Sequence, residues 1–291
     1  MEAHNPAVTR ANDGTYLLFS IGNNPLVQSK SLFGPWRKVN GFKNRTFNCN
    51  NPAPVVVPGR DEVYVYCHGL PVGRPLGLAW TPRWDSGVWH VATNNSDDLI
   101  GNGSSLIAHS IEDPFAWYAA PPESASNNCS NLSIAESAAA HAEATGGSFH
   151  MLFHAFQMGM VNNSGATLGG QGTSATSSVK GQALRRVGNA YGAYANALTP
   201  FGPWKFQEAR VAYSGVLNLT NNIQLGLLRR ERPHLLLDSA TGQPTHLYNG
   251  VCPDGNHYGE MGTQKNHCFT MVQSIGMGTS LQHSGQPLAP T

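Results

Sequence analysis

The chain has 291 residues and a mass of 31.1 kDa, which is enough for one large domain with its own hydrophobic core. Charged residues make up 12% of it, about half the share usual in soluble domains, and 32 glycines and 19 prolines indicate many turns. The 18 Lys and Arg against 17 Asp and Glu leave a net charge of +1, which argues against nucleic acid and anionic membrane surfaces as partners. No apolar run approaches the roughly 20 residues that cross a bilayer.

Four segments of the chain begin in the same way, with a short polar stretch, a proline and then apolar residues. These openers are His4-Asn5-Pro6, Asn50-Asn51-Pro52, Glu112-Asp113-Pro114 and Glu231-Arg232-Pro233. Each opener is followed by a second run rich in aromatic and β-branched residues, at residues 15–21, 62–67, 148–156 and 244–251. Such runs, preceded by turn residues, predict β-hairpins.

A third element that ends in tryptophan follows in three of the units, at residues 27–36, 78–89 and 194–204. The first and the last of these share the sequence Phe-Gly-Pro-Trp, at residues 33–36 and 201–204. Three or four strands in each repeated unit are typical of the blades of a β-propeller. A β-sandwich is the alternative all-β architecture, but it does not explain the repeated openers.

The repeats predict a single all-β domain over residues 1–291, with blade-like units at about 3–48, 49–95, 110–208 and 229–276 and a tail at 277–291. Two polar stretches, 121–140 and 159–181, interrupt the third unit, and the entropy of loop closure grows slowly enough to allow them. The second stretch is rich in glycine but lacks the Gly-Lys-Ser/Thr ending of a phosphate-binding loop. We therefore interpret it as a flexible loop.

The five cysteines lack the Cys-x-x-Cys spacing of zinc and redox motifs, which favours disulfides. Cys49 with Cys67 and Cys252 with Cys268 would each close a short loop, worth about 3 kcal/mol in the chain-entropy description. This pairing leaves Cys129 over, and the sequence alone does not prove it.

Seven Asn-x-Ser/Thr sequons, from Asn44 to Asn218, favour a secreted glycoprotein. The alternative is that an Asn-rich chain collects sequons without using them. The residues after Met1 lack the apolar core of a signal peptide, so we expect the signal of a secreted protein upstream of this sequence.

On its openers the chain resembles the five-bladed β-propeller glycoside hydrolases of family 43 and its relatives in families 32, 62 and 68, over about residues 3–275. In that group the catalytic carboxylates stand on openers that read Asp-Pro in blades one and three and Glu-x-Pro in blade four. Asp113 matches the third-blade Asp and Glu231 the fourth-blade Glu, and residues 29–36 are similar to a third strand of family 43. The resemblance implies five blades. Because 60 residues follow Glu231, we expect the fifth blade to be incomplete or upstream of Met1.

The resemblance also implies catalytic roles, because glycosidic cleavage needs an acid at the leaving oxygen and a base or nucleophile across the sugar. Glu231 would be the general acid and Asp113 the modulator of its pKa. Asn5 stands at the position of the general base, where an amide cannot accept a proton as a carboxylate does. The structural alternatives are a turn-capping role for Asp113 and, for Glu231, an ion pair with one of the neighbouring arginines.

Further polar residues near the openers or on the second strands are candidates for sugar binding. They are His4, Asn51, His68, His154, Arg232 and Asn249. No His-Glu-x-x-His or similar ligand spacing occurs, so no catalytic metal is predicted and no cofactor is required. A structural Ca²⁺ or Na⁺ near the propeller axis is compatible with the resemblance.

The leading hypothesis is a secreted, monomeric glycoside hydrolase that cleaves a plant- or algal-type glycan, such as an arabino- or xylo-oligosaccharide, by general acid–base catalysis. The rival hypothesis is a non-catalytic carbohydrate-binding propeller, in which Asn5 records the loss of the base. A protein-interaction scaffold is a third reading, since a fold alone does not fix a function.

Overall fold

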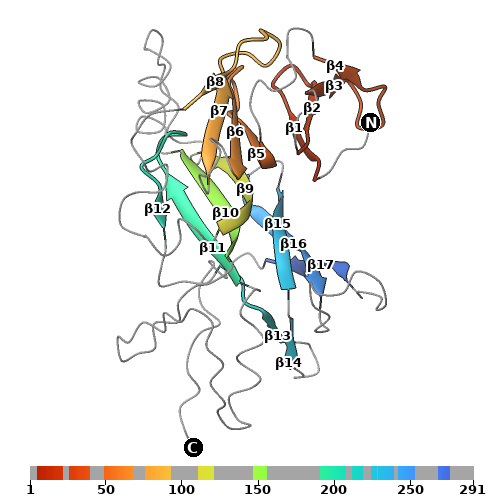
Figure 1. The fold of residues 1–291 in the computed structure, drawn as a ribbon, viewed down its shortest axis with the longest axis vertical. Helices are drawn as coiled ribbons and strands as arrows, with labels where there is room; N and C mark the ends of the chain where they lie inside the picture. Colours follow the sequence, from red (N-terminus) through yellow and green to blue (C-terminus); the bar gives the residue numbers. More distant parts are fainter. Residues whose placement is uncertain are drawn as a thin grey trace, which may run out of the picture.

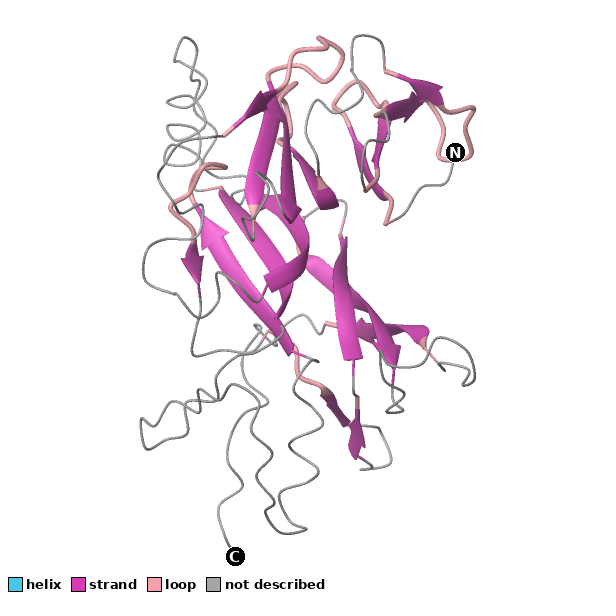
Figure 2. Cartoon of the chain, viewed as in Figure 1, coloured by secondary structure: helices cyan, strands magenta, loops and turns pink. Residues whose placement is uncertain are grey.

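A computed structural model of the chain describes residues 5–21, 26–39, 49–68, 76–92, 111–120, 147–155, 191–206, 212–218, 224–227, 229–238, 242–252 and 268–275. These residues form strands and connecting turns and contain no helix, which confirms the all-β prediction (Figures 1 and 2). Nothing in this part of the chain is therefore a helix able to cross a membrane. The segments predicted as loops at 121–140 and 159–181 and the tail at 277–291 lie outside the described residues.

Four antiparallel sheets, each running in chain order, account for most of the strands. Blade 1 comprises β1 (Ala7–Arg10), β2 (Tyr16–Phe19), β3 (Val27–Ser29) and β4 (Arg37–Lys38). Blade 2 comprises β5 (Asn50–Val56), β6 (Val63–His68), β7 (Gly77–Thr81) and β8 (His90–Val91). Blade 3 comprises β9 (Ile111–Ala119), β10 (Ser148–Ala155), β11 (Tyr191–Ala197) and β12 (Lys205–Phe206). Blade 4 comprises β15 (Arg229–Leu237), β16 (Pro244–Cys252) and β17 (Phe269–Ser274). The hairpin of β13 (Val216–Asn218) and β14 (Gln224–Gly226) precedes blade 4.

The four blades form a propeller-like arrangement in which the first strand of each sheet lies toward a common centre (Figure 1). β1 packs beside β5, β5 beside β9, and β9 beside β15. The predicted innermost and second strands are therefore found in all four units.

The predicted third elements are shorter than expected. As strands they end well before the tryptophans, at Ser29, Thr81 and Ala197, and a turn then leads into a fourth strand of two residues. In both copies of Phe-Gly-Pro-Trp the glycine has a φ of 87° and the Gly-Pro bond is cis. Glycine and proline are uncommon inside strands, and in both units they lie in the connection between the third and the fourth strand.

Each opener places one non-glycine residue in the left-handed region of the backbone, directly before its proline. The φ values are 45° at Asn5, 48° at Asn51, 50° at Asp113 and 53° at Arg232. In blades 2, 3 and 4 the pairing of the first two strands shifts at this point, which marks a β-bulge. Asn and Asp tolerate this conformation better than other non-glycine residues, whereas Arg232 adopts it at a higher steric cost.

The core lies between the blades as well as within them. One cluster joins blades 1 and 2 through residues such as Leu17, Phe19 and Val65. A second joins blades 2 and 3, and a third joins blades 3 and 4 around Trp117 and Leu247. The apolar alternation of each strand therefore stacks one blade on the next, and this fixes the openers around the centre.

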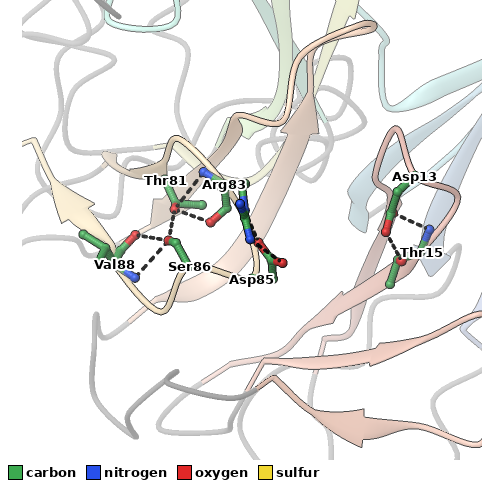
Figure 3. A network of polar contacts seen from close by, with 7 residues as sticks. All are labelled: Asp13, Thr15, Thr81, Arg83, Asp85, Ser86 and Val88. Carbon is green, nitrogen blue, oxygen red and sulfur yellow. Dashed lines mark hydrogen bonds and ion pairs between the residues drawn. The ribbon is translucent and has the colours of Figure 1, made fainter.

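The outer turns are stabilised by their own polar side chains (Figure 3). Asp13 accepts hydrogen bonds from the amide of Thr15 at 2.9 Å and from its hydroxyl at 2.8 Å. In blade 2, Arg83 donates to both carboxylate oxygens of Asp85, at 2.6 and 3.0 Å. Such side-chain caps are typical of tight turns. The Arg83–Asp85 pair is exposed, whereas Thr15 is buried beneath its turn.

Both predicted disulfides are present. Cys49 is bonded to Cys67, which joins the start of blade 2 to its second strand, and Cys252 is bonded to Cys268 in blade 4. Cys129 lies outside the described residues.

Candidate active site

The openers of the four blades meet around one polar cavity of about 270 Å³. Its lining comprises Asn5, Ile21, Asn50, Asn51, His68, Glu112, Asp113, Arg229, Glu231 and Arg232. Three carboxylates, two guanidinium groups and three side-chain amides thus face one space. The cavity volume is near the lower end of the range of small-ligand sites.

A chain of hydrogen bonds runs from blade 1 to blade 3 across the cavity floor. Asn5 Nδ2 donates to Asn51 Oδ1 at 2.6 Å, and Asn51 Nδ2 donates to Asp113 Oδ1 at 2.6 Å. An ionised carboxylate only accepts hydrogen bonds, so Asp113 fixes the orientation of both amides. The arrangement leaves Asn5 Oδ1 to accept from a water molecule or a sugar hydroxyl.

Asp113 is a buried carboxyl group of the cavity, and its pKa is raised. Its exposure is only 8%, and burial together with the charge of Glu112 raises its pKa to about 6, against smaller opposing effects of Arg232 and His154. Asp113 therefore exchanges its proton close to neutral pH, in the range where acid–base catalysis operates.

Glu231 forms an ion pair with Arg229. Its Oε1 lies 2.5 Å from Nη2 and 2.6 Å from Nε of the arginine, and the glutamate side chain is 16% exposed. The ion pair proposed as the structural alternative for Glu231 is thus formed, with Arg229 as the partner. The same carboxylate also lines the cavity, so the two roles are not exclusive.

A second cavity, of about 290 Å³, lies against the same ring of openers. It shares Asn5, Asn51, Asp113 and Arg232 with the first cavity, and its other lining residues are Pro6, Ala7, Pro52, Pro114, Pro233 and His234. The left-handed residues therefore touch both spaces, a polar one and a largely apolar one lined by the four prolines.

The structure brings most of the predicted site residues together. Asn5, Asn51, His68, Asp113, Glu231 and Arg232 all line the polar cavity. His154 and Asn249 are 0% and 1% exposed and belong to the second strands behind the openers, outside the lining of either cavity. His4 lies outside the described residues.

Sequence reasoning missed four lining residues: Ile21, Asn50, Glu112 and Arg229. Two of them carried a signal, because Asn50 and Glu112 occupy the same place in their openers as Glu231 does in its own. Alignment of the openers on their prolines would therefore have identified both.

One group of side chains in the described part of the chain could take part in holding a cation. One ligand atom each of Glu112, Asp113 and His154 lies within 4.8 Å of the others. Two carboxylates suit Ca²⁺ or Na⁺, whereas an imidazole suits transition metals better. Ca²⁺ takes six to eight oxygen ligands, so waters or sugar hydroxyls would have to complete its shell here.

No family model matches the chain. In an alignment 124 positions long that covers 38% of this chain, it is 32% identical to two proteins named probable arabinan endo-1,5-alpha-L-arabinosidase C, from Aspergillus flavus and Aspergillus oryzae. The matched segment spans 39% of the length of each relative. The resemblance to glycoside hydrolases that the openers indicated is thus found again in this part of the chain.

Two solved structures align with most of the chain at low identity. The xylan beta-1,4-xylosidase of Bacillus halodurans C-125 is 12% identical, with a TM-score of 0.44 over 93% of this chain and 41% of its own. The catalytic domain of the Coprinopsis cinerea GH62 alpha-L-arabinofuranosidase is 11% identical, with a TM-score of 0.44 over 92% of this chain and 72% of its own.

Proposed function

We propose that this chain is a glycoside hydrolase that cleaves an arabinose- or xylose-containing glycan by general acid–base catalysis. The observation that supports this most directly is the convergence of Glu112, Asp113 and Glu231, from two different blades, on one polar cavity lined by amides. Carboxyl groups with different environments, facing one another across a sugar-sized space, are what glycosidic cleavage requires.

In this proposal Glu231 protonates the leaving oxygen. Its carboxylate accepts from Arg229, so a sugar that enters must draw Arg229 away before Glu231 can carry the proton. Asp113, with a pKa of about 6, is mostly ionised at neutral pH, and its negative charge acts through the electrostatic field on Glu231. Asn5 Oδ1 orients the attacking water, and the hydrogen-bond chain through Asn51 fixes the position of Asn5. The proton that this water loses passes to the carboxylate of Glu112, which lines the same cavity, because an amide cannot accept it.

A second candidate is a carbohydrate-binding propeller without catalysis. Asn5 favours it, because an amide at the position that matches the general base cannot accept a proton as a carboxylate does. The ion pair of Glu231 with Arg229 favours it as well, since both groups are then satisfied in the absence of a proton transfer. Arg232, His68 and Asn51 would remain as hydrogen-bonding groups for the sugar.

The preference for arabinose rests on the names of the two Aspergillus relatives, and the proposal extends it to xylo-oligosaccharides. The same proposal includes five blades in the whole propeller and a structural cation near Asp113. It also includes secretion, glycosylation and a monomeric state. The two disulfides support an oxidising compartment.

The test is sugar release from arabinan, xylan and aryl arabinofuranosides by the full chain, by Glu231→Gln and by Glu62→Gln. Glu62 is a matched control because it also pairs with an arginine two residues before it, Arg60, and lies outside the lining of both cavities. We expect Glu231→Gln to lower kcat by about 10²–10⁴ while sugar binding persists, and Glu62→Gln to leave it unchanged.

Equal release by the wild type and Glu231→Gln would refute the assigned acid. If the wild type releases no sugar but binds it in calorimetry, the carbohydrate-binding candidate is favoured instead.

A further inference from the structure

The opener of blade 4 rests on a buried arginine. Arg230 is 2% exposed, and its guanidinium lies 4.7 Å from the ring centre of Tyr213. It donates to Asn249 Oδ1 at 2.9 Å, to the main-chain oxygen of Ser214 at 2.8 Å and to Gln273 Oε1 at 2.9 Å. These acceptors are all neutral and come from β16, β17 and the segment before β13. Burial lowers the pKa of Arg230 to about 10, so the group is still a cation at neutral pH.

Asn249 connects Arg230 to the main chain of Glu231 on β15. Arg230 only donates hydrogen bonds, so it fixes the amide of Asn249 with its oxygen toward the guanidinium. The amide nitrogen is left to donate to the main-chain oxygen of Glu231, at 3.3 Å. The pairing runs from Glu231 opposite Gly250 to His234 opposite Tyr248. Asn249 is therefore the single residue across from the bulge that follows Glu231.

Blade 2 has a covalent link between the equivalent positions. Its pairing runs from Asn50 opposite His68 to Ala53 opposite Tyr66, so Cys67 is the single residue across from that bulge. Counting from Asn50 and from Glu231, Cys49 corresponds to Arg230 and Cys67 to Asn249. The two cysteines form a disulfide and are 3% and 0% exposed. The same pair of strand positions is thus joined by sulfur in one blade and by a guanidinium–amide hydrogen bond in the other.

We propose that Arg230 and Asn249 are positioning residues for Glu231, which together clamp the blade-4 bulge as the Cys49–Cys67 disulfide clamps the bulge of blade 2. This inference rests on the proposed hydrolase function. Neither residue lines the cavities, so neither touches the sugar. The clamp holds the main-chain oxygen of Glu231 and the start of the bulge, and so aims the Glu231 side chain into the polar cavity. Small displacements of a catalytic group are costly to the rate, whereas a purely structural role would change stability alone.

The test replaces the guanidinium–amide hydrogen bond of blade 4 with a disulfide like that of blade 2. Arg230→Cys with Asn249→Cys introduces a disulfide at positions whose blade-2 counterparts have Cα atoms 5.1 Å apart, within the range a disulfide spans. Arg230→Ser with Asn249→Ser is the matched control, because serine has nearly the same shape and cannot form the link. Asn249→Ser alone, which keeps Arg230 and its other contacts, serves if the double serine variant does not fold.

Two readouts are measured on each variant: kcat and KM on aryl arabinofuranosides and arabinan, and amide hydrogen exchange at Glu231, Arg232 and His234. We expect the serine variants to lower kcat about 10- to 100-fold with KM changed less than about twofold, and the opener to exchange about tenfold faster. The oxidised cysteine pair should recover both, although it carries no charge.

Slow exchange at the opener in the serine variants would overturn the proposal. Fast exchange with an unchanged kcat would overturn it as well, because the clamp would then be irrelevant to catalysis. If the wild type itself releases no sugar, the hydrolase assignment fails, and loss and recovery of slow exchange then decide on the clamp alone.

Discussion

Asp113→Asn should make the protein more stable at neutral pH. Asp113 is buried, and its pKa in the folded chain is about 6 against an ordinary value of 3.8. Between these values the folded state binds a proton that the unfolded state has released, so stability falls as the pH rises. The stabilising contribution is complete below pH 3.8 and is lost once the pH exceeds 6. Asparagine has the same shape and can still accept from Asn51 through its own Oδ1.

The expected change in the free energy of unfolding follows from the size of the pKa shift of Asp113. Moving the pKa of a carboxyl from 3.8 to about 6 corresponds to about 3 kcal/mol between its protonated and ionised forms. The effect must be measured as a difference between wild type and variant, because His150 has the opposite dependence. Burial lowers the pKa of His150 to about 4, so its contribution to stability is lost as the pH falls. The two groups partly cancel in the wild-type curve and separate only in the difference.

The assay is urea unfolding of both proteins from pH 3.5 to 7.5, with the disulfides intact. The stability of the wild type minus that of Asp113→Asn should fall by about 3 kcal/mol across this range, with most of the change between pH 4 and 6. Asp85→Asn is the control, because Arg83 lowers the pKa of the exposed Asp85 and the corresponding difference should rise with pH instead. A difference for Asp113 that stays flat or rises with pH would refute the reasoning.

Two further predictions concern packing, and each compares a variant with a control. Tyr66 is compared with Tyr64 on the same strand, and Gly192 is compared with Gly226. Tyr66→Phe should cost about 1–2 kcal/mol, because the Tyr66 hydroxyl donates to the main-chain oxygen of Pro200 at 2.8 Å inside the core. Tyr64→Phe should cost close to nothing, since that buried hydroxyl has no hydrogen-bond partner among the described residues; an equal loss from both, by urea unfolding, would contradict this reading. Gly192→Ala should destabilise by about 1–3 kcal/mol or more, because a Cβ there would lie 2.1 Å from the Tyr213 ring. At Gly226 no atom of the described residues lies within 4 Å of the added carbon, so Gly226→Ala should be nearly neutral. Similar melting temperatures for the two alanine variants would count against the stated clash.

The openers could be predicted from the sequence because they repeat. A polar residue before proline at the start of an apolar run identifies the first strand of each blade, and the four first strands meet at the centre as expected. The fourth strands and the β13–β14 hairpin were missed because two or three residues carry no periodicity of their own.

The partners of individual side chains could not be predicted in the same way. Asn249 was expected to face a sugar, and in the structure it lies beneath the opener, bonded to Arg230. Arg229, Arg230 and Arg232 have the same side chain, so the sequence does not distinguish their roles. The alternation of β15 and its bulge pair Arg229 with Glu231, bury Arg230 and place Arg232 in the cavity lining. A one-residue difference at a bulge reverses such assignments.

The left-handed residue of each opener has an implication for how activity can be gained or lost in this chain. At φ near 45–50° the backbone selects short polar side chains, and Asn and Asp satisfy it equally well. An exchange between the two at position 5 would suit the same backbone conformation but alter the chemistry, because a carboxylate oxygen would replace the amide nitrogen that donates to Asn51 and would add a proton acceptor. The backbone conformation and the presence of a proton acceptor are thus set independently at this position, and Asn5→Asp is the smallest change that would add a further carboxylate to the cavity lining.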